Sequence, residues 1–158
     1  DEFIDKDLTM RDYLSEIISS FREISQKKFI FNYDQFSNQK KITKSIEIVY
    51  GLRNFIGNAN KFSNTEIYIT LKSDSEITEI TIEDDGNGYP KDVLSKIGEP
   101  YLRTKDPIDK SKAGLGLGLF IGKTLLEKNF ASINCRNSKT RSGAEVIIKW
   151  NNKDLFNI

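Results

Sequence analysis

An aspartate and two glycines, Asp84, Gly86 and Gly88, follow a strand-like segment, residues 77–83. Isoleucine alternates with polar residues there, so one face is apolar, and the two-residue period places Asp84 on that face. A carboxylate directed into a core is costly unless a partner satisfies it, and alternating glycines let another group approach the backbone. An isolated motif of this kind is more typical of a polar turn, but two further unusual segments flank it in the sequence.

The first flanking segment is a polar stripe of Asn54, Asn58 and Lys61 on a predicted helix, with spacings of four and three residues. Asparagine is a mediocre helix former, so a pair one turn apart needs an explanation. A solvated helix face is the default one. The alternative is a site where an amide oxygen binds a Mg²⁺ that keeps several waters and also binds phosphates, with the lysine meeting phosphate charge.

The second flanking segment is Gly114-Leu115-Gly116-Leu117-Gly118. It is no P-loop, because Gly122-Lys123-Thr124 would need a glycine where Leu117 stands, and no dinucleotide fingerprint, because Leu119 or Ile121 would have to be the third glycine. What remains is a glycine-rich turn before a helix N-terminus, where free N–H groups and the helix dipole favour a phosphate. A structural hinge is an equally good interpretation of this segment alone.

Combined, the three segments predict a nucleotide site. Asp84 would accept a hydrogen bond from an adenine amino group, and Asn58 would hold the metal. The glycines of residues 114–118 would wrap the phosphates. The long charged segment 89–113 would close over the nucleotide as a lid, since loops of this length in compact domains are usually functional or disordered.

Hydrophobic periodicity predicts the elements that must position these residues. Spacings of three and four residues predict helices over 10–24, 42–62 and 119–128, with a capping box of Thr9 and Asp12 before the first and a short helix over 91–97. Alternation predicts strands over 29–33, 65–72, 77–83, 131–137 and 144–150. Because helices and strands do not alternate strictly, an α+β layered sandwich is favoured over a parallel doubly wound sheet.

Composition narrows the possible functions. The 158 residues fit one domain, and 24 basic against 23 acidic residues give no charge excess that would indicate a nucleic-acid partner. A single cysteine, Cys135, excludes an intrachain disulfide and is expected to be a small core residue. The chain has no histidine, so it contains no histidine base, ligand or phosphoacceptor. No apolar run reaches membrane-spanning length, so we expect a soluble fragment, although it could come from a membrane protein.

The three segments, in this order and spacing, resemble the ATP-binding domain of sensor histidine kinases. Residues 54–63, Asn-Phe-Ile-Gly-Asn-Ala-Asn-Lys-Phe-Ser, resemble the N box of that family. Asp84-x-Gly86-x-Gly88 resembles the first glycine box, and residues 114–119, Gly-Leu-Gly-Leu-Gly-Leu, resemble the second. The resemblance extends over residues 42–129, and three ordered boxes are far more specific than any one of them.

The resemblance implies a Bergerat-type two-layer α/β sandwich, with a mixed, mostly antiparallel sheet packed under three helices, as in gyrase, MutL and the large heat-shock chaperone. It implies ATP and Mg²⁺ as ligands. By position, Asn58 is the magnesium ligand and Asp84 the adenine acceptor, Asn54 and Lys61 face the phosphates, and Phe62 walls the pocket. The remaining implied nucleotide contacts are Gly86, Gly88, Gly114, Leu115, Gly116, Leu117, Gly118 and Leu119.

The lid region resembles one subgroup of the sensor kinases closely, and at two positions it departs from the usual kinase pattern. Residues 98–104, Gly-Glu-Pro-Tyr-Leu-Arg-Thr, together with residues 114–127, look like the RegB/PrrB-type redox-responsive sensor kinases. By resemblance, Arg103 or Lys105 reaches the γ-phosphate. Gly98 replaces a phenylalanine usual in the kinases, which bears on how the lid is anchored, and Leu115 replaces a frequent threonine and its hydroxyl.

Two mechanisms are consistent with this fold. ATPases and ATP-gated interaction modules of the superfamily typically carry glutamate at the position of Asn54, where a carboxylate can act as general base; an amide cannot take that proton. Slow hydrolysis and transfer of the γ-phosphate to a histidine are therefore favoured, by positioning and charge neutralisation.

The acceptor histidine would belong to a separate, upstream dimerisation domain, because the chain has no histidine. We expect residues 1–8 to be the hinge to that domain and residues 9–158 to be the catalytic domain. The expected partners are that domain, in a homodimer, and a response regulator. The expected location is the cytoplasmic portion of an inner-membrane sensor.

Overall fold

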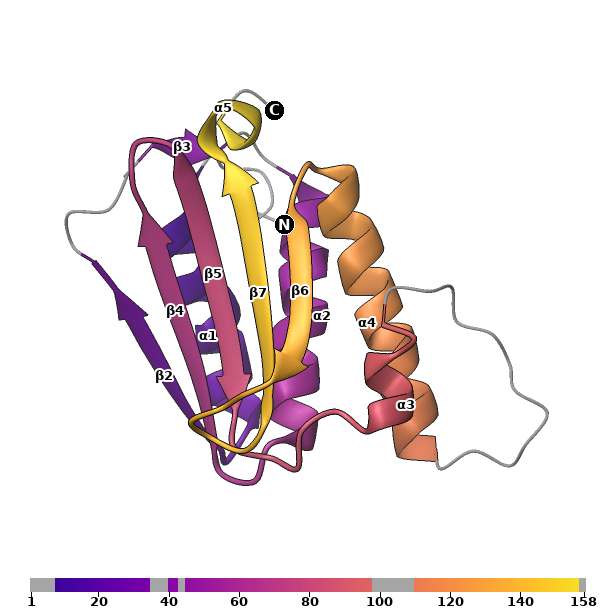
Figure 1. Ribbon diagram of the computed structural model, residues 1–158. Coiled ribbons are helices and arrows are strands. Elements are labelled where there is room, and N and C mark those ends of the chain that lie inside the picture. Colours follow the sequence, from indigo (N-terminus) through magenta and orange to yellow (C-terminus); the bar gives the residue numbers. More distant parts are fainter. Residues whose placement is uncertain (1–7, 35–39, 43–44, 98–109, 157–158) are drawn as a thin grey trace.

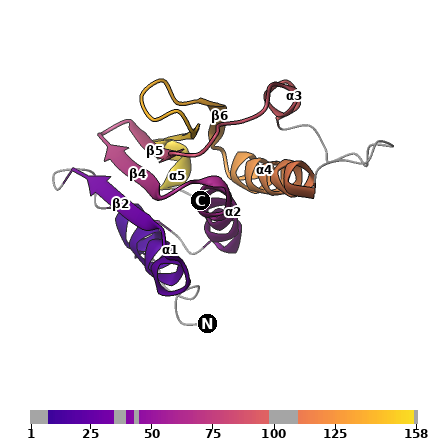
Figure 2. The same cartoon turned by 90° about the horizontal axis from the view of Figure 1, so that it is seen from below.

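The computed structural model describes residues 8–34, 40–42, 45–97 and 110–156, and for 110–115 it describes the backbone alone. Three long helices lie on one face of a five-stranded sheet (Figure 1). Seen along the strands, sheet and helices form two separate layers (Figure 2). The expected α+β two-layer sandwich is confirmed.

The sheet has the strand order β2-β4-β5-β7-β6. These strands span β2 Lys28–Tyr33, β4 Glu66–Ser73, β5 Ile77–Asp84, β7 Ala144–Asn151 and β6 Ser132–Asn137. Strand β2 pairs with β4 in parallel, and the other three pairings are antiparallel. The expected mixed, mostly antiparallel sheet is thus confirmed, and β5 with its terminal Asp84 lies in the middle of it.

The helices α1 (Met10–Ile24), α2 (Ile46–Phe62) and α4 (Lys110–Lys128) cover the inner face of the sheet. Helix α1 begins as its sequence predicts, because the Thr9 hydroxyl accepts a hydrogen bond of 3.1 Å from the Asp12 N–H. Its apolar stripe and that of α2 are buried in one hydrophobic core together with the inner residues of β4 and β5. Two single-turn helices complete the fold, α3 (Lys91–Leu94) and α5 (Asn152–Leu155).

The sequence did not predict a small second sheet. Strand β1 (Leu8–Thr9) pairs with β3 (Lys41–Ile42), so Leu8, assigned to a linker, lies opposite Ile42. For the same reason α2 begins four residues later than predicted, at Ile46, after the Ser45 hydroxyl has accepted a hydrogen bond from the Ile48 N–H. Isoleucine fits the apolar stripe of a helix and the buried side of a strand equally well, and the pairing with β1 decides between them.

The glycine-rich segment also differs from its predicted structure. We expected it to be a turn before a helix that starts at Leu119, but it lies inside α4, which begins at Lys110. Glycine weakens a helix interior without forbidding it, and at Gly118 the close packing against Asn58 leaves no room for a larger residue. Helix α3 is shorter than the predicted 91–97, and most of the expected lid, residues 98–109, lies outside the described residues.

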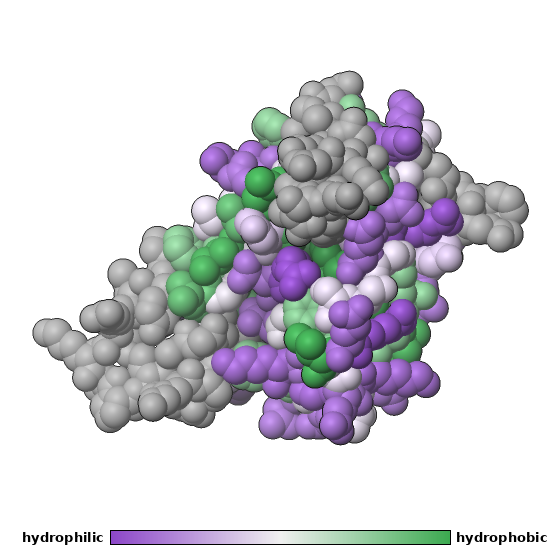
Figure 3. Space-filling view, turned by 180° about the vertical axis from the view of Figure 1, so that it is seen from behind, coloured by the Kyte–Doolittle hydropathy of each residue, from purple (hydrophilic) through white to green (hydrophobic). Residues whose placement is uncertain are grey.

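The helical face exposes some large apolar side chains on α2 and α4: Ile46, Tyr50, Leu117 and Ile121. Figure 3 shows this face as a mixture of green hydrophobic and purple hydrophilic residues. Among the residues that the structure describes, no helix is long and apolar enough to cross a bilayer. Cys135 lies on β6 against the core, and its burial raises the pKa of the thiol to about 11, as suits a packing residue rather than a reactive thiol.

Candidate nucleotide-binding site

Within the polar stripe of α2, Asn58 lies in the packed interface with α4. The Asn58 side chain faces α4 at Gly118, where an added Cβ would lie 2.7 Å from Asn58 Oδ1 and 2.8 Å from Nδ2. Asn58 Nδ2 is buried and has no hydrogen-bond partner among the described residues. A buried amide left unpaired costs about 1–3 kcal/mol, so this one is a candidate to bind a ligand rather than to stabilise the fold.

One turn away on each side, Asn54 and Lys61 are more exposed. Asn54 Nδ2 donates a hydrogen bond of 2.8 Å to the Tyr50 carbonyl of the preceding turn. The Lys61 ammonium lies 5.2 Å from the centre of the Phe62 ring and is free to approach a phosphate from the same end of the helix. Of the predicted stripe, only Asn58 is thus committed to the interface with α4.

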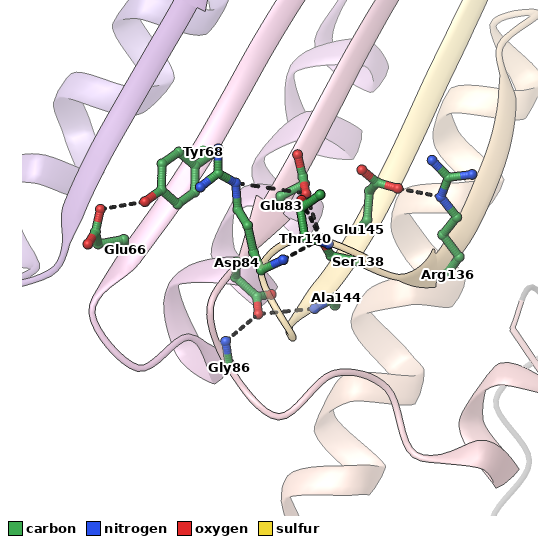
Figure 4. A network of polar contacts seen from close by, with 11 residues as sticks. Glu66, Tyr68, Glu83, Asp84, Gly86, Arg136, Ser138, Thr140, Ala144 and Glu145 are labelled. Atoms are coloured by element: carbon green, nitrogen blue, oxygen red, sulfur yellow. Dashed lines mark hydrogen bonds and ion pairs between the residues drawn. The ribbon is translucent and has the colours of Figure 1, made fainter.

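Asp84 points into the protein from the last position of β5, as its place in the strand predicted, and only 4% of it is exposed. Its Oδ1 accepts two backbone hydrogen bonds, of 2.9 Å from the Gly86 N–H and of 3.2 Å from the Ala144 N–H (Figure 4). Within the described parts of the chain, no group donates to the other oxygen, Oδ2. Burial raises the pKa of this carboxyl, and the two backbone hydrogen bonds only partly oppose the effect.

The loop after β5 is pressed against the C-terminal end of α2. A Cβ at Gly86 would lie 2.2 Å from the Phe62 carbonyl oxygen, so only glycine fits there. Gly88 has a φ of +78°, which favours glycine, and a Cβ there would lie 2.7 Å from Asn137 Oδ1. These contacts bring the first glycine segment beside Phe62, as the nucleotide interpretation requires.

The residues of the glycine-rich part of α4 differ in how close they lie to the candidate site. Gly118 meets Asn58, Leu117 is 42% exposed, and Leu119 is 2% exposed and belongs to the core. A direct nucleotide contact by the Leu119 side chain therefore does not fit this arrangement of α4. Gly116 lies between them in the helix, while Gly114 and Leu115 are described by their backbone alone. Arg103 and Lys105, expected to reach the γ-phosphate, lie outside the described residues.

Several residues that hold this site in place were not predicted from the sequence. Asp85 accepts hydrogen bonds from the Asn64 N–H (2.8 Å) and from the Thr65 N–H (3.0 Å) and hydroxyl (2.6 Å), which joins the end of α2 to the end of β5. Lys27 donates to the Ser63 carbonyl (2.7 Å) and to the Asn60 carbonyl at the same helix end. Local sequence carries no signal for these pairings, although acidic and basic residues near helix ends are a general hint.

The arrangement has two chemically distinct ends. At the end of β5, a fixed carboxylate with one available oxygen can accept a hydrogen bond from an amino group. Along the α2–α4 interface, an unpaired amide and the exposed Lys61 can meet a cation and its anions. No cluster of three or more His, Cys, Asp or Glu side chains suited to a metal occurs in the described residues, so a cation here would take most of its ligands from water or phosphate.

Comparison with known proteins identifies the family. Residues 43–154 match the family described as histidine kinase-, DNA gyrase B- and HSP90-like ATPase. The chain belongs to this family. The membership confirms the resemblance drawn from the three boxes and establishes a nucleotide-binding fold.

Two proteins with similar sequences are sensor histidine kinases. The sensor histidine kinase RegB of Cereibacter sphaeroides is 36% identical over 127 residues, which cover 71% of this chain and 28% of RegB. The sensor histidine kinase CpxA of Escherichia coli is 31% identical over 87 residues, covering 55% of this chain and 19% of CpxA. The expected similarity to RegB-type kinases is confirmed, and the chain spans less than a third of the length of these relatives.

Solved structures agree on the fold. The catalytic domain of the histidine kinase ThkA superposes with a TM-score of 0.73 at 21% identity, covering 92% of this chain and 94% of that domain. The mycobacterial sensor histidine kinase MprB gives a TM-score of 0.69 at 18% identity, covering 92% and 97%. The Bergerat-type sandwich expected from the resemblance is thus confirmed.

Proposed function

We propose that this chain is the ATP-binding catalytic domain of a two-component sensor histidine kinase. It transfers the γ-phosphate of ATP to a histidine on a separate dimerisation domain, for relay to a response regulator. The observation that carries the proposal is the convergence of the three boxes: Asn58 of the first lies against Gly118 of the third, and Phe62 of the first lies against Gly86 of the second.

Asp84 is the adenine acceptor in this proposal. Its Oδ1 is held by the Gly86 and Ala144 N–H groups, which leaves Oδ2 to accept a hydrogen bond from the adenine amino group. Gly86 lets the loop after β5 pack against the Phe62 carbonyl, and Gly88 packs against Asn137, so the two glycines hold this loop beside Asp84. Phe62 and the adjoining end of α2 wall the pocket.

Asn58 fits the role of magnesium ligand, because its amide is buried beside Gly118 and half of it has no partner. Oxygen and nitrogen of an amide exchange places on a half-turn of the side chain, so the oxygen can be presented to the cation. Bound Mg²⁺ would neutralise charge on the phosphates, and Lys61 would add a second positive charge from the same helix. Residues 114–118 and, in the 89–113 lid, Arg103 or Lys105 complete the phosphate contacts.

Asn54 distinguishes the kinase interpretation from the ATPase interpretation. Its side chain is an amide whose nitrogen already donates to the Tyr50 carbonyl, and it has no group that can accept a proton from water. The ATPase alternative predicts phosphate release, for which Asn54 provides no general base.

The wider assembly follows from the same proposal. Residues 9–158 form the catalytic domain, and residues 1–8 lead to the dimerisation domain of a homodimer. The whole protein is proposed to be an inner-membrane sensor with this domain in the cytoplasm; the sensor role is supported by the similarity to the sensor histidine kinases named above.

The decisive experiment measures thermal unfolding with Mg²⁺–ADP and with a non-hydrolysable ATP analogue, for the wild type and Asp84→Asn. In the variant, the Gly86 and Ala144 N–H groups still hold the amide oxygen, so the amide nitrogen faces the adenine amino group and two donors meet. Glu79→Gln is the matched control, because it removes a carboxylate from the other face of the same strand.

Ligand at about 100 times its dissociation constant stabilises a protein by about 2.7 kcal/mol, or several degrees for a domain of this size. We expect that shift in the wild type and the control and its loss in Asp84→Asn. Equal shifts in all three proteins would exclude Asp84 as the adenine acceptor, and no shift in the wild type would exclude nucleotide binding by this chain.

A further inference from the structure

The turn that joins β6 to β7 is folded over the end of β5 and touches both of its faces (Figure 4). Glu83 and Asp84 are neighbours in β5, so their side chains point to opposite faces of the sheet. Residues 138–143 form the turn, closed by a hydrogen bond of 2.7 Å from the Ser138 N–H to the Gly143 carbonyl. Ser142 has a φ of +63°, a conformation that non-glycine residues seldom adopt.

On the outer face, Glu83 and Tyr68 hold this turn. The Ser138 hydroxyl donates to Glu83 Oε2 at 2.8 Å and accepts from the Arg141 N–H at 3.1 Å. Arg141 Nε lies 3.9 Å from Glu83 Oε2, and its guanidinium lies 3.4 Å from the centre of the Tyr68 ring. The Tyr68 hydroxyl in turn donates to Glu66 Oε2 at 2.6 Å. Charge and stacking thus fix the turn to β4 and β5 from outside.

On the inner face, the same turn fixes Asp84. A Cβ at Gly143 would lie 2.0 Å from the Asp84 carbonyl oxygen and 2.3 Å from Oδ1, so the bare glycine backbone lies directly against the aspartate. The next residue, Ala144, donates its N–H to Oδ1 at 3.2 Å. A displacement of the turn would therefore remove one of the two hydrogen bonds that orient the carboxylate.

We propose that the 138–143 turn is a positioning element of the adenine site, held by Arg141 and Glu83 from the face of the sheet opposite the nucleotide. Arg141 and Glu83 are positioning residues: they touch no nucleotide and act through the turn on the orientation of Asp84. The consequence is specificity for adenine, since adenine presents an amino group where guanine presents a carbonyl oxygen, and only a fixed acceptor rejects the second. This inference rests on the proposed function.

The test compares ADP and GDP binding, each with Mg²⁺, by titration calorimetry for the wild type and Arg141→Ala. Because contacting residues are energetically coupled, we expect ADP binding to weaken by about three- to tenfold in Arg141→Ala. GDP binding should weaken less, so the ratio of the two dissociation constants should fall. If Arg141→Ala only destabilised the protein and Arg141 had no positioning role, the binding of ADP and of GDP would weaken by the same factor. Glu83→Gln removes the ionic contact from the β5 side and should act in the same direction.

Lys149→Ala is the matched control. It also removes an ion pair between a basic residue and a glutamate of β5 on the same face, Lys149 Nζ to Glu79 Oε1 at 3.5 Å, but far from Asp84. Arg141→Lys keeps the charge but not the planar stacking, and should restore binding in part.

The possible results distinguish a failure of the positioning role from a failure of the proposed function. If the wild type binds ADP, Asp84→Asn does not, and Arg141→Ala keeps the wild-type ratio of ADP to GDP affinity, the positioning role is wrong while the proposed function stands. If the wild type binds neither nucleotide, both proposals are wrong.

Discussion

The two oxygens of the Asp84 carboxylate have different surroundings. Backbone N–H groups of Gly86 and Ala144 hold Oδ1, and no described residue donates to Oδ2. The side chain is nevertheless buried, and burial raises its pKa above the ordinary value of 3.8. Such a group, tuned by desolvation and left with one available oxygen, is typical of a functional site.

The first prediction concerns pH. The ionised carboxylate accepts the adenine hydrogen bond and the protonated form does not, so nucleotide affinity should fall as pH is lowered through the raised pKa of Asp84, starting at a higher pH than for an ordinary aspartate. Unfolding without nucleotide should show the opposite dependence, with stability falling as pH rises through the same window, because the native state binds more protons there. Binding titrations of the wild type, and denaturant unfolding of the wild type and Asp84→Asn, from about pH 3.8 to neutrality measure the two effects.

The second prediction concerns Gly118. Gly118→Ala places a Cβ 2.7 Å from Asn58 Oδ1, so α4 or the amide must move. We expect a loss of about 1–3 kcal/mol in stability from overpacking and weaker binding of Mg²⁺–nucleotide. Gly57→Ala is the control, because its Cβ would lie 3.5 Å from the Phe21 ring, an ordinary contact. There helix propensity should stabilise the protein by up to about 1 kcal/mol. Equal effects of the two substitutions on nucleotide affinity would contradict the site.

At the level of elements, the site depends on how α2 ends. Lys27 donates to carbonyl groups of its last turn, and Asp85 binds the Asn64 and Thr65 backbone just beyond it. Burial by itself would raise the pKa of Asp85, but these hydrogen bonds outweigh it and lower the value to about 2. The end of β5 and the end of α2 are therefore joined by an ionised carboxylate.

The third prediction follows from that junction. The lowered pKa of Asp85 stabilises the native state fully above the ordinary value of 3.8, and this contribution is lost as pH falls towards about 2. Asp85→Asn should thus be less stable than the wild type at neutral pH, by about 1–3 kcal/mol for hydrogen bonds to a charged group, and the two proteins should converge near pH 2. Urea unfolding at several pH values measures the difference. A constant difference at every pH would mean that charge has no part in the junction.

At the level of the whole molecule, helices α2 and α4 are brought unusually close by glycines on both. A Cβ at Gly51 would lie 2.6 Å from Leu126, and one at Gly122 would lie 2.7 Å from the Phe55 ring. The same close approach places Gly118 on Asn58. The interface between these helices is therefore part of the nucleotide site, and changes that separate the helices should alter both stability and binding.

The fourth prediction concerns activity. The chain has no histidine, so with labelled ATP it should bind nucleotide but acquire no acid-labile phosphohistidine. A histidine-containing dimerisation domain added in trans should become labelled, and Asp84→Asn should abolish that transfer. Release of inorganic phosphate at rates comparable to the transfer, without an acceptor, would favour the ATPase alternative instead.

Sequence alone determined what depends on neighbours along the chain. The apolar period of α1 and its Thr9 cap, the alternation that turns Asp84 inward, and the order of the three boxes all follow from local residue patterns and were confirmed by the fold and the family. These features are short-range, because helical and strand periods are set within a few residues.

Tertiary structure decided what depends on residues far apart. It paired Leu8 with Ile42, extended α4 through the glycines, and brought the 138–143 turn onto Asp84, some 60 positions earlier in the chain. A serine, an arginine and a glycine in a turn indicate only a turn when they are considered locally. Their role at Asp84 exists because β7 lies beside β5, and that neighbour relation arises from the packing of the whole sheet against its helices.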